Sequence, residues 1–386
     1  MKSAFVNARV LTAEGFRDDV AVLVENGIVA AIVADDDARV RAAEVCDLGG
    51  GFLLPGFIDC QVNGGGGVLF NDAPTVETIR RIGAAHRRFG TTGFLPTLLS
   101  DDVDVMRAAI AAVDAAIAEG VPGVLGIHLE GPYLAAVRRG VHDATKFRVP
   151  DAAEIDLASS LRNGRTVLTL APECVPLDAI REFVRRGMIV CAGHTAATYS
   201  EMRAALDAGV RGFTHLYNAM SPLTSREPGV VGAALEDAAS WCGIVVDGHH
   251  VHPASLRVAL AAKPRGKIFL VTDAMPPVGA DTDTYTLGGV TATCRDGRCE
   301  TPDGVLAGSA LDMASALRNT VQSLAVPLDE AARMASTYPA EFLGITQNRG
   351  RIAPGMRADF VELGSDLVVR RTWIGASESP LSASWK

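Results

Sequence analysis

Residues 188–194 read Met188-Ile189-Val190-Cys191-Ala192-Gly193-His194, an apolar run that ends in a glycine and a histidine. Such a run is typical of a strand that is buried on both faces in a parallel sheet. The histidine would then lie at the carboxyl end of its strand, where a (β/α)8 barrel carries its functional residues. The stretch therefore predicts an α/β fold of the barrel type, with His194 at the functional end.

The same pattern recurs along the chain. A polar residue follows a short apolar run at three further places: Glu130 after residues 124–127, His215 after residues 212–213, and Asp273 after residues 268–271. Because the carboxyl ends of barrel strands meet at one face, we expect these side chains to converge.

The predicted elements change in character at two points. Residues 1–54 and residues 350–386 contain short strands and turns, whereas strands alternate with amphipathic helices over residues 55–349. That alternation indicates βαβ units and a parallel sheet. We expect a (β/α)8 TIM-like barrel over 55–349 and a small β-sandwich domain formed by the two termini. Residues 283–304 predict a β-hairpin excursion from the barrel.

Composition narrows the class of protein. The 386 residues are 48% hydrophobic and include 39 glycines, which suits a well-buried α/β enzyme. A net charge of −9 argues against nucleic acid or an anionic membrane as a partner. An anionic substrate would therefore need a local basic pocket. No stretch approaches the roughly 20 apolar residues of a membrane helix, so we expect a soluble protein.

Cysteine usage favours the cytoplasm. The seven cysteines are scattered and form no Cys-x-x-Cys pair, which favours reduced thiols over a disulfide framework. The N-terminal residues alternate like a strand and lack the apolar block of a signal peptide.

Glu130, His194 and His215 are candidate metal ligands. Catalytic zinc commonly takes two histidines and a carboxylate and keeps a position open for water. A single strand-end histidine is often structural, but Gly131 and Gly193 leave backbone room beside these residues. Asp273 caps a turn or acts as a general base, and the neighbouring metal set favours the base.

Three loop motifs leave alternatives open. Three histidines fall within residues 249–252 and cannot all face one way on an extended chain. We expect His250 to face the pocket and the other two to be solvated or structural. Arg226 is either a solvated loop residue or a bidentate phosphate contact. The glycines at 64–67 lack the order of a nucleotide-binding loop and favour a strand-end turn.

Taken together, these motifs resemble the amidohydrolase superfamily and, within it, the N-acetylglucosamine-6-phosphate deacetylases. The resemblance runs nearly end to end. It is carried by residues 55–59, 128–132, 193–194, 214–220, 226–229, 247–250 and 271–274. The superfamily's first strand usually reads His-x-His, but this chain has Gln61 and Asn63 there. Amides are poor zinc ligands, so we expect one divalent metal per chain, Zn²⁺ by preference.

The resemblance implies a full set of site residues. Glu130, His194 and His215 would hold the metal, with Gln61 touching it only through water. Asp273 would act as the acid–base group, and His142 would polarise the amide carbonyl. The implied substrate contacts are Val141, Asn218, Ala219, Arg226, His250, Leu306, Ala307 and Gly308. His250 and Arg226 would bind the phosphate, and Arg226 would reach the neighbouring site of a homodimer.

The implied reaction is hydrolysis of the N-acetyl group of N-acetylglucosamine 6-phosphate to glucosamine 6-phosphate and acetate. Three alternative functions compete with this one. The substrate could be an epimer such as N-acetylgalactosamine 6-phosphate, because epimer choice depends on one or two loop contacts. Cyclic amide opening or deamination is disfavoured, since those relatives keep the paired first-strand histidines. A silent sugar-phosphate binder is disfavoured, because all four central residues are present. Catabolism and cell-wall sugar recycling are equally compatible with the sequence.

Overall fold

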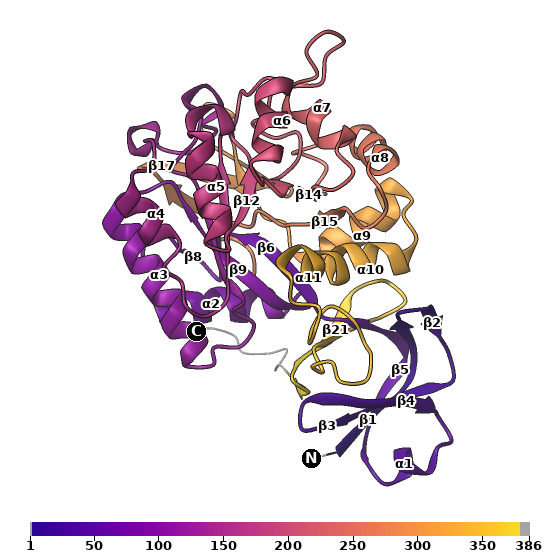
Figure 1. Cartoon of the computed structure of the whole chain (residues 1–386). Helices are drawn as coiled ribbons and strands as arrows, with labels where there is room; N and C mark the ends of the chain where they lie inside the picture. The colour runs from indigo at the N-terminus through magenta and orange to yellow at the C-terminus, as the bar shows by residue number, and fades with distance from the viewer. Residues whose placement is uncertain (1, 379–386) are drawn as a thin grey trace.

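The computed structural model describes residues 2–378 of the chain, which form a barrel and a separate sheet built from both termini (Figure 1). This confirms the predicted α/β fold. Consecutive barrel strands are neighbours joined by helical connections, so that the carboxyl end of each strand lies beside that of the next.

Eight parallel strands form the barrel, in the order β6-β9-β10-β11-β12-β13-β14-β15. Their bounds are β6 Phe57–Val62, β9 Thr91–Leu99, β10 Gly126–Glu130, β11 Arg165–Leu170, β12 Ile189–Ala192, β13 Gly212–Phe213, β14 Trp241–Ile244 and β15 Ile268–Leu270. Most of their residues are buried on both faces, which is why these segments read as continuous apolar runs.

The barrel closes between its first and last strands. A parallel bridge joins Val62 to Ala274, and the Asp273 backbone N–H donates to the Gln61 carbonyl oxygen at 3.1 Å. Beneath this seam the Thr272 hydroxyl donates to the buried Asp59 carboxyl at 2.5 Å. Burial raises the pKa of Asp59 to about 7. The seam sets Gln61 and Asp273 side by side.

Helices surround the barrel, one or more after each strand. They are α2 Val76–Arg87, α3 Val103–Ala118, α4 Ala152–Ala158, α5 Leu177–Arg185, α6 Tyr199–Asp207, α7 Gly229–Glu236, α8 Pro253–Ala262, α9 Met313–Leu324, α10 Leu328–Ala335 and α11 Thr337–Leu343. Three single turns, η1 Ala136–Arg138, η2 Ala144–Lys146 and η3 Pro172–Cys174, lie in loops that follow β10 and β11.

The termini share one sheet, in the order β22-β21-β20-β5-β1-β3-β4 with β2 paired to β1. Its elements are β1 Lys2–Thr12, β2 Gly15–Arg17, β3 Val20–Glu25, β4 Ile28–Ala34, α1 Ala38–Arg41, β5 Glu44–Pro55, β20 Phe360–Leu363, β21 Val369–Ile374 and β22 Ser377–Glu378. The Phe5 ring lies edge-on to Phe360 and Trp373, 5.2 Å from each. Residues from both chain ends therefore share this core.

Gly56 marks the passage from the terminal sheet into the barrel, between β5 and β6. A Cβ at this position would lie 2.2 Å from the Thr92 hydroxyl oxygen, so only glycine allows the approach to β9.

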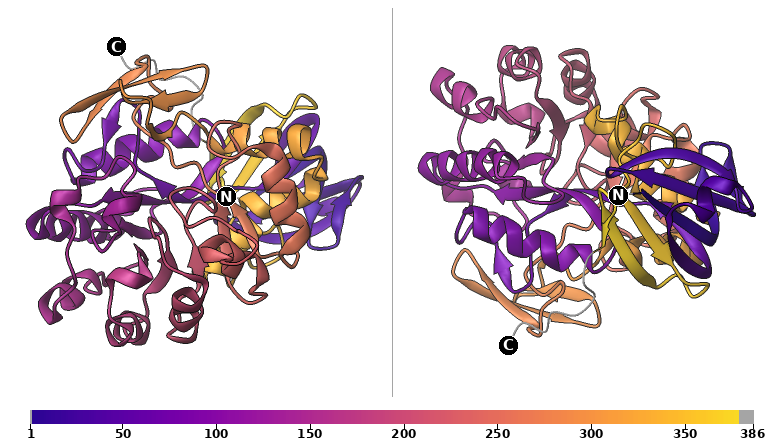
Figure 2. Two further views of the ribbon diagram at one scale, coloured as in Figure 1. Left: turned by 90° about the horizontal axis from the view of Figure 1, so that it is seen from above. Right: turned by 90° about the horizontal axis from the view of Figure 1, so that it is seen from below.

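An antiparallel sheet leaves the barrel after β15, packs against Leu69 and Met275, and lies at the edge of the molecule (orange in Figure 2). Its strands are β16 Thr284–Leu287, β17 Val290–Arg295, β18 Arg298–Glu300 and β19 Leu306–Ser309, and β7 Gly64–Gly65 pairs with β8 Val68–Leu69 nearby. The expected hairpin excursion is confirmed, and Asp296-Gly297 forms its β17–β18 turn.

One cysteine prediction is wrong. Cys294 and Cys299 form a disulfide across β17 and β18, where the two residues stand directly opposite each other. The expectation of reduced thiols weighed chain spacing alone, and the antiparallel register brings this pair together. Five other cysteines of the described chain are free. Across residues 2–378, no helix combines the length and apolarity needed to cross a membrane.

Candidate active site

The predicted strand-end residues converge at the carboxyl ends of the barrel strands. Glu130 ends β10, His194 follows β12, His215 follows β13 and Asp273 follows β15. His194, His215 and Asp273 have φ angles of +48°, +35° and +55°. Non-glycine residues rarely adopt this left-handed region, and such strain concentrates at functional sites. The positive φ turns each side chain inward just past its strand.

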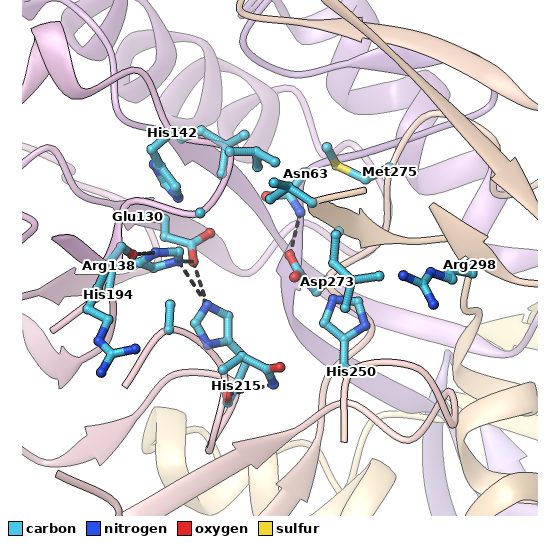
Figure 3. A pocket seen from close by; sticks show the side chains of 18 of the residues that line it. Asn63, Glu130, Arg138, His142, His194, His215, His250, Asp273, Met275 and Arg298 are labelled. Atoms are coloured by element: carbon cyan, nitrogen blue, oxygen red, sulfur yellow. Dashed lines mark hydrogen bonds and ion pairs between the residues drawn. The ribbon is translucent and has the colours of Figure 1, made fainter. Parts of the chain in front are cut away.

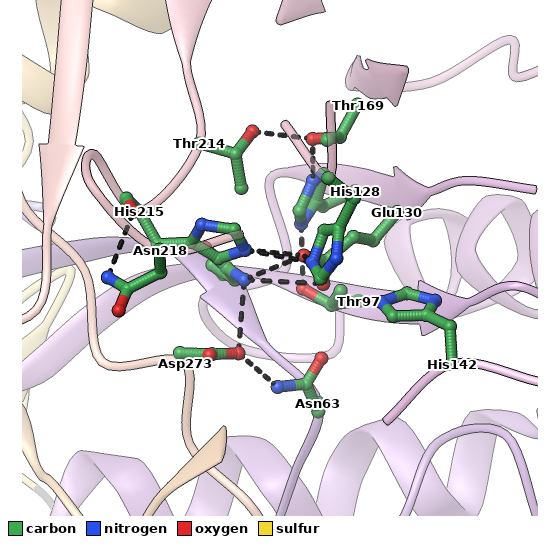
Figure 4. Close-up of polar contacts among 12 residues, drawn as sticks. Asn63, Thr97, His128, Glu130, His142, Thr169, Thr214, His215, Asn218 and Asp273 are labelled. Atoms are coloured by element: carbon green, nitrogen blue, oxygen red, sulfur yellow. Dashed lines mark hydrogen bonds and ion pairs between the residues drawn. The ribbon is translucent and has the colours of Figure 1, made fainter. Parts of the chain in front are cut away.

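Glu130, His194 and His215 form a tight buried triangle (Figure 4). Glu130 Oε1 lies 3.0 Å from His215 Nε2 and 3.2 Å from His194 Nε2, and the two ring nitrogens are 3.1 Å apart. Two imidazoles and a carboxylate from the ends of three different strands match the donor set of a catalytic zinc site.

Hydrogen bonding orients the ligand atoms of this triangle. The His194 Nδ1 position lies 2.9 Å from the Arg138 carbonyl oxygen and so donates its proton there, which leaves Nε2 unprotonated for a metal. Burial raises the pKa of Glu130, but hydrogen bonds and charge from His194 and His215 outweigh it and hold the pKa well below 4.5. The carboxylate is therefore ionised, and the residues fit a divalent metal.

His128 belongs to the barrel interior instead. Its Nδ1 lies 3.1 Å from the Thr97 hydroxyl and its Nε2 lies 2.8 Å from the Thr169 hydroxyl (Figure 4). Burial lowers the pKa of His128 to about 4, so it is a neutral structural residue with both nitrogens satisfied.

Gln61 joins Asp273 to the triangle of Glu130, His194 and His215, which we call the metal group. Its Nε2 donates to Glu130 Oε2 at 3.2 Å and to Asp273 Oδ1 at 3.0 Å, and Asn63 Nδ2 donates to the same Asp273 oxygen at 2.7 Å. Burial, and then the charge of Glu130, raise the pKa of Asp273 above 3.8. A carboxylate with a raised pKa, held by two amides, is suited to take and return a proton.

His142 faces the metal group as a neutral donor. The Ser100 backbone N–H donates to its Nδ1 at 3.3 Å, so the ring proton sits on Nε2. Burial, and then the neighbouring His194, lower the pKa of His142 to about 3. Its ring lies 4.5 Å from that of His194, centroid to centroid, which places the Nε2–H donor near the metal group.

These residues line one cavity of about 520 Å³ (Figure 3). Its lining includes the predicted residues Glu130, Val141, His142, His194, His215, Asn218, Ala219, His250, Asp273, Leu306 and Gly308. Three predicted residues lie elsewhere. Gln61 is buried beneath the cavity, Ala307 points into the core of the hairpin sheet, and Arg226 is exposed on the loop before α7.

The histidines of residues 249–252 divide as expected. The Asp247 carboxylate accepts a hydrogen bond from His250 Nδ1 at 2.6 Å. This contact turns the other edge of the ring toward the cavity. His249 is exposed, and its Nε2 donates to the Asp296 carbonyl oxygen at 3.0 Å. His252 caps α8 by accepting the Ala254 backbone N–H.

Seven further side chains line the cavity that the sequence alone did not assign to it: Asn63, Leu99, Val137, Arg138, Met275, Arg298 and Val305. Asn63 lies two residues after Gln61, and this period of two could have placed both on one face. Arg298 comes from the hairpin excursion, and no sequence pattern ties that hairpin to the strand ends.

Comparison with known proteins agrees with this geometry. The family model described as the amidohydrolase family matches residues 52–378. The chain belongs to the amidohydrolase family. It is 44% identical over 368 residues to the N-acetylgalactosamine-6-phosphate deacetylase of Shewanella sp. (strain ANA-3), covering 95% of this chain and 93% of that protein.

Other similar proteins are named for the glucosamine substrate. Identity to the N-acetylglucosamine-6-phosphate deacetylase of Vibrio furnissii is 38% over 371 residues, covering 95% of this chain and 92% of the relative. The crystal structure of N-acetylglucosamine-6-phosphate deacetylase from Pasteurella multocida superposes with a TM-score of 0.94 at 35% identity, covering 98% of this chain and 99% of the other. The similarity therefore spans both barrel and terminal sheet.

The triangle predicts the metal content of the purified protein. We expect about one tightly bound divalent ion per chain, since one carboxylate and two imidazoles make a single site. Glu130→Gln should abolish it, because an amide is a poor ligand. Elemental analysis after dialysis measures the metal content of the wild-type protein and of Glu130→Gln.

His142→Gln is the matched control, since His142 lines the same cavity outside the triangle and its loss should leave the metal in place. Two ions per chain, or a full complement in Glu130→Gln, would contradict the assignment.

Proposed function

We propose that this chain is a metal-dependent deacetylase of N-acetylhexosamine 6-phosphates, which hydrolyses the N-acetyl group of N-acetylglucosamine 6-phosphate to glucosamine 6-phosphate and acetate. One observation carries the proposal: a buried Glu-His-His group, a neutral His142 and an amide-held Asp273 surround one cavity in a chain of the amidohydrolase family. That set provides ligands, a hydrogen-bond donor and an acid–base group for amide hydrolysis.

The residues divide the reaction between them. A divalent metal held by Glu130, His194 and His215 would supply Lewis acidity to the attacking water and to the amide carbonyl. Asp273 accepts a proton as water adds to the carbonyl carbon. The Nε2–H of His142 donates to the carbonyl oxygen as negative charge develops on it. Asp273 then passes its proton to the nitrogen as the carbon–nitrogen bond breaks, which leaves acetate and an amine.

The epimer of the sugar is the second candidate. The Shewanella relative named for the galactosamine substrate is 44% identical, against 38% for the Vibrio furnissii relative named for the glucosamine substrate. N-acetylgalactosamine 6-phosphate is therefore a candidate substrate of the same site. The two sugars differ only at C4, away from the acetamide, so the chemistry above is the same for both.

Acetate release tests the function directly. We expect zinc-loaded protein to release acetate from N-acetylglucosamine 6-phosphate or its galacto epimer, and a chelator to stop it. The two unphosphorylated sugars are the controls and should be much poorer substrates. Release from neither phosphate ester, with metal bound, would reject the proposal. The ratio of kcat/KM for the two esters assigns the epimer.

Asp273 is the proposed acid–base residue. Asp273→Asn should lower kcat by at least roughly a hundredfold, since an acid–base group is worth about that much. Metal content and the folded state should be unchanged. The same substitution on an exposed helix, Asp178→Asn in α5, should have no effect on kcat. Near-normal turnover by Asp273→Asn would remove the residue from this role.

We propose a homodimer in which Arg226 reaches the neighbouring site. The support is that Arg226 is exposed and does not line the cavity of its own chain. An arginine there can bind a phosphate in a bidentate manner.

A mixed dimer distinguishes this from a role in the same chain. Arg226→Ala should raise KM for the phosphorylated sugar only. Co-expression of Arg226→Ala with Asp273→Asn should restore activity, because one site then keeps its own Asp273 and receives the partner's arginine. No recovery, or a monomer by sedimentation, would contradict the proposal.

We propose zinc as the preferred metal, since two imidazoles and a carboxylate suit it, although such sites accept other divalent ions.

Water between Gln61 and the metal is also part of the proposal. In the structure Gln61 donates directly to both carboxylates, which leaves its carbonyl oxygen to accept from a water. A cytoplasmic location stays a prediction.

A further inference from the structure

The hairpin sheet β16–β19 forms one wall of the cavity. Its lining residues include Arg298 on β18 and Leu306 and Gly308 on β19. The neighbouring Cys299 is buried in the core of this sheet, and because side chains alternate along a strand, Arg298 is directed away from that core. The excursion therefore brings a guanidinium to the mouth of the barrel.

Arg298 lies at the opposite end of the cavity from the metal group. In Figure 3, Arg298 and His250 lie on one side of Asp273, and Glu130, His194 and His215 lie on the other. In an N-acetylhexosamine 6-phosphate the acetamide on C2 and the phosphate on C6 project from opposite sides of the ring. With the acetamide at the metal group, the phosphate points toward Arg298 and His250.

The guanidinium has donors to offer. Arg298 Nε lies 2.7 Å from Glu300 Oε2, in an ion pair with half-exposed side chains. Across residues 2–378 this is its one ion pair, so both terminal nitrogens remain available. Two parallel N–H donors match two phosphate oxygens. Exposed ion pairs contribute little to stability. The Glu300 contact uses only Nε, so it orients the side chain and leaves the two terminal nitrogens free to bind an anion.

The charge balance of the chain favours a cation at the phosphate end of the cavity. The protein carries a net charge of −9, which repels a sugar phosphate. Arg226 does not line the cavity of its own chain, and Arg138 lies on the His194 side of the cavity in Figure 3. Arg298 is thus the arginine that the chain itself brings to the His250 end.

The hairpin is tied to His250 through its turn. His249 Nε2 donates to the Asp296 carbonyl oxygen at 3.0 Å, two residues before Arg298. The Asp247 carboxylate accepts the backbone N–H groups of His249 and His250 at 2.9 Å each. This chain of contacts fixes Arg298 and His250 relative to each other, as a paired anion site requires.

We propose that Arg298 is a substrate-binding residue that holds the 6-phosphate within the same chain that supplies Asp273. This rests on the proposed function for the identity of the sugar phosphate. It adds Arg298 on β18 to the β19 residues Leu306 and Gly308, which were already expected to contact the substrate.

The matched pair Arg298→Ala and Arg295→Ala tests the proposal. Arg295 stands directly opposite Arg298 across the β17–β18 turn, is exposed and does not line the cavity. Arg298→Ala should raise KM for the preferred N-acetylhexosamine 6-phosphate by about 10- to 100-fold, the usual worth of hydrogen bonds to a charged group. Turnover of the unphosphorylated sugar should not change. Arg295→Ala should match wild type, and Arg298→Lys should fall between.

Binding supplies a readout that does not depend on turnover. Calorimetry with glucosamine 6-phosphate and with glucosamine measures how much the phosphate contributes to binding affinity in each holoprotein. Loss of that contribution in Arg298→Ala but not in Arg295→Ala supports the proposal, even if wild type deacetylates neither ester and the proposed function fails. Equal behaviour of the two variants, equal losses for both ligands, or no binding of glucosamine 6-phosphate by wild type would overturn it.

Discussion

Glu130 is a carboxylate buried at the carboxyl end of a barrel strand, and the electrostatic requirement of that burial organises the site. An ionised carboxyl removed from water is stable only with close partners. Here two imidazole nitrogens at 3.0 and 3.2 Å and the Gln61 amide provide them. A divalent cation would satisfy the same carboxylate and take an Nε2 nitrogen of each imidazole as a ligand. A cation bound by these three residues would therefore stabilise the buried Glu130 carboxylate.

The barrel seam extends this constraint to Asp273, the proposed acid–base residue. Asp273 would be a second buried anion beside Glu130, and their mutual repulsion contributes to its raised pKa. Gln61 relieves the repulsion, because one amide donates to both carboxylates. A histidine at position 61 would offer one nitrogen to this region where the amide offers two protons. The amide thus replaces a metal ligand with a bridge, which fits a site of one metal.

The sequence predicted the parts of the site that depend on strand periodicity. Glu130, His194, His215 and Asp273 each follow an apolar run, and parallel strands bring their ends to one face. Arg298 lines the cavity because of how the hairpin sheet packs on the barrel, which no local pattern encodes. The disulfide between Cys294 and Cys299 follows instead from the antiparallel register across the Asp296-Gly297 turn, which the predicted hairpin could have supplied. The exposure of Arg226 outside its own cavity likewise depends on a loop path. Alternation and strand ends are local signals, whereas the packing of an insertion is not.

The two ends of the cavity differ in construction, and this difference bears on specificity. The metal end is made of buried side chains on barrel strands, where shifts of a fraction of an ångström would disturb proton transfer. The proposed phosphate end is made by a loop and an inserted hairpin, whose Arg298 is half-exposed and held by one surface ion pair. Surface connections tolerate sequence change that a barrel interior does not. Relatives named for sugars that differ only at C4 can therefore share the hydrolytic end, and we expect their sequence differences to gather in the more exposed wall formed by β16–β19.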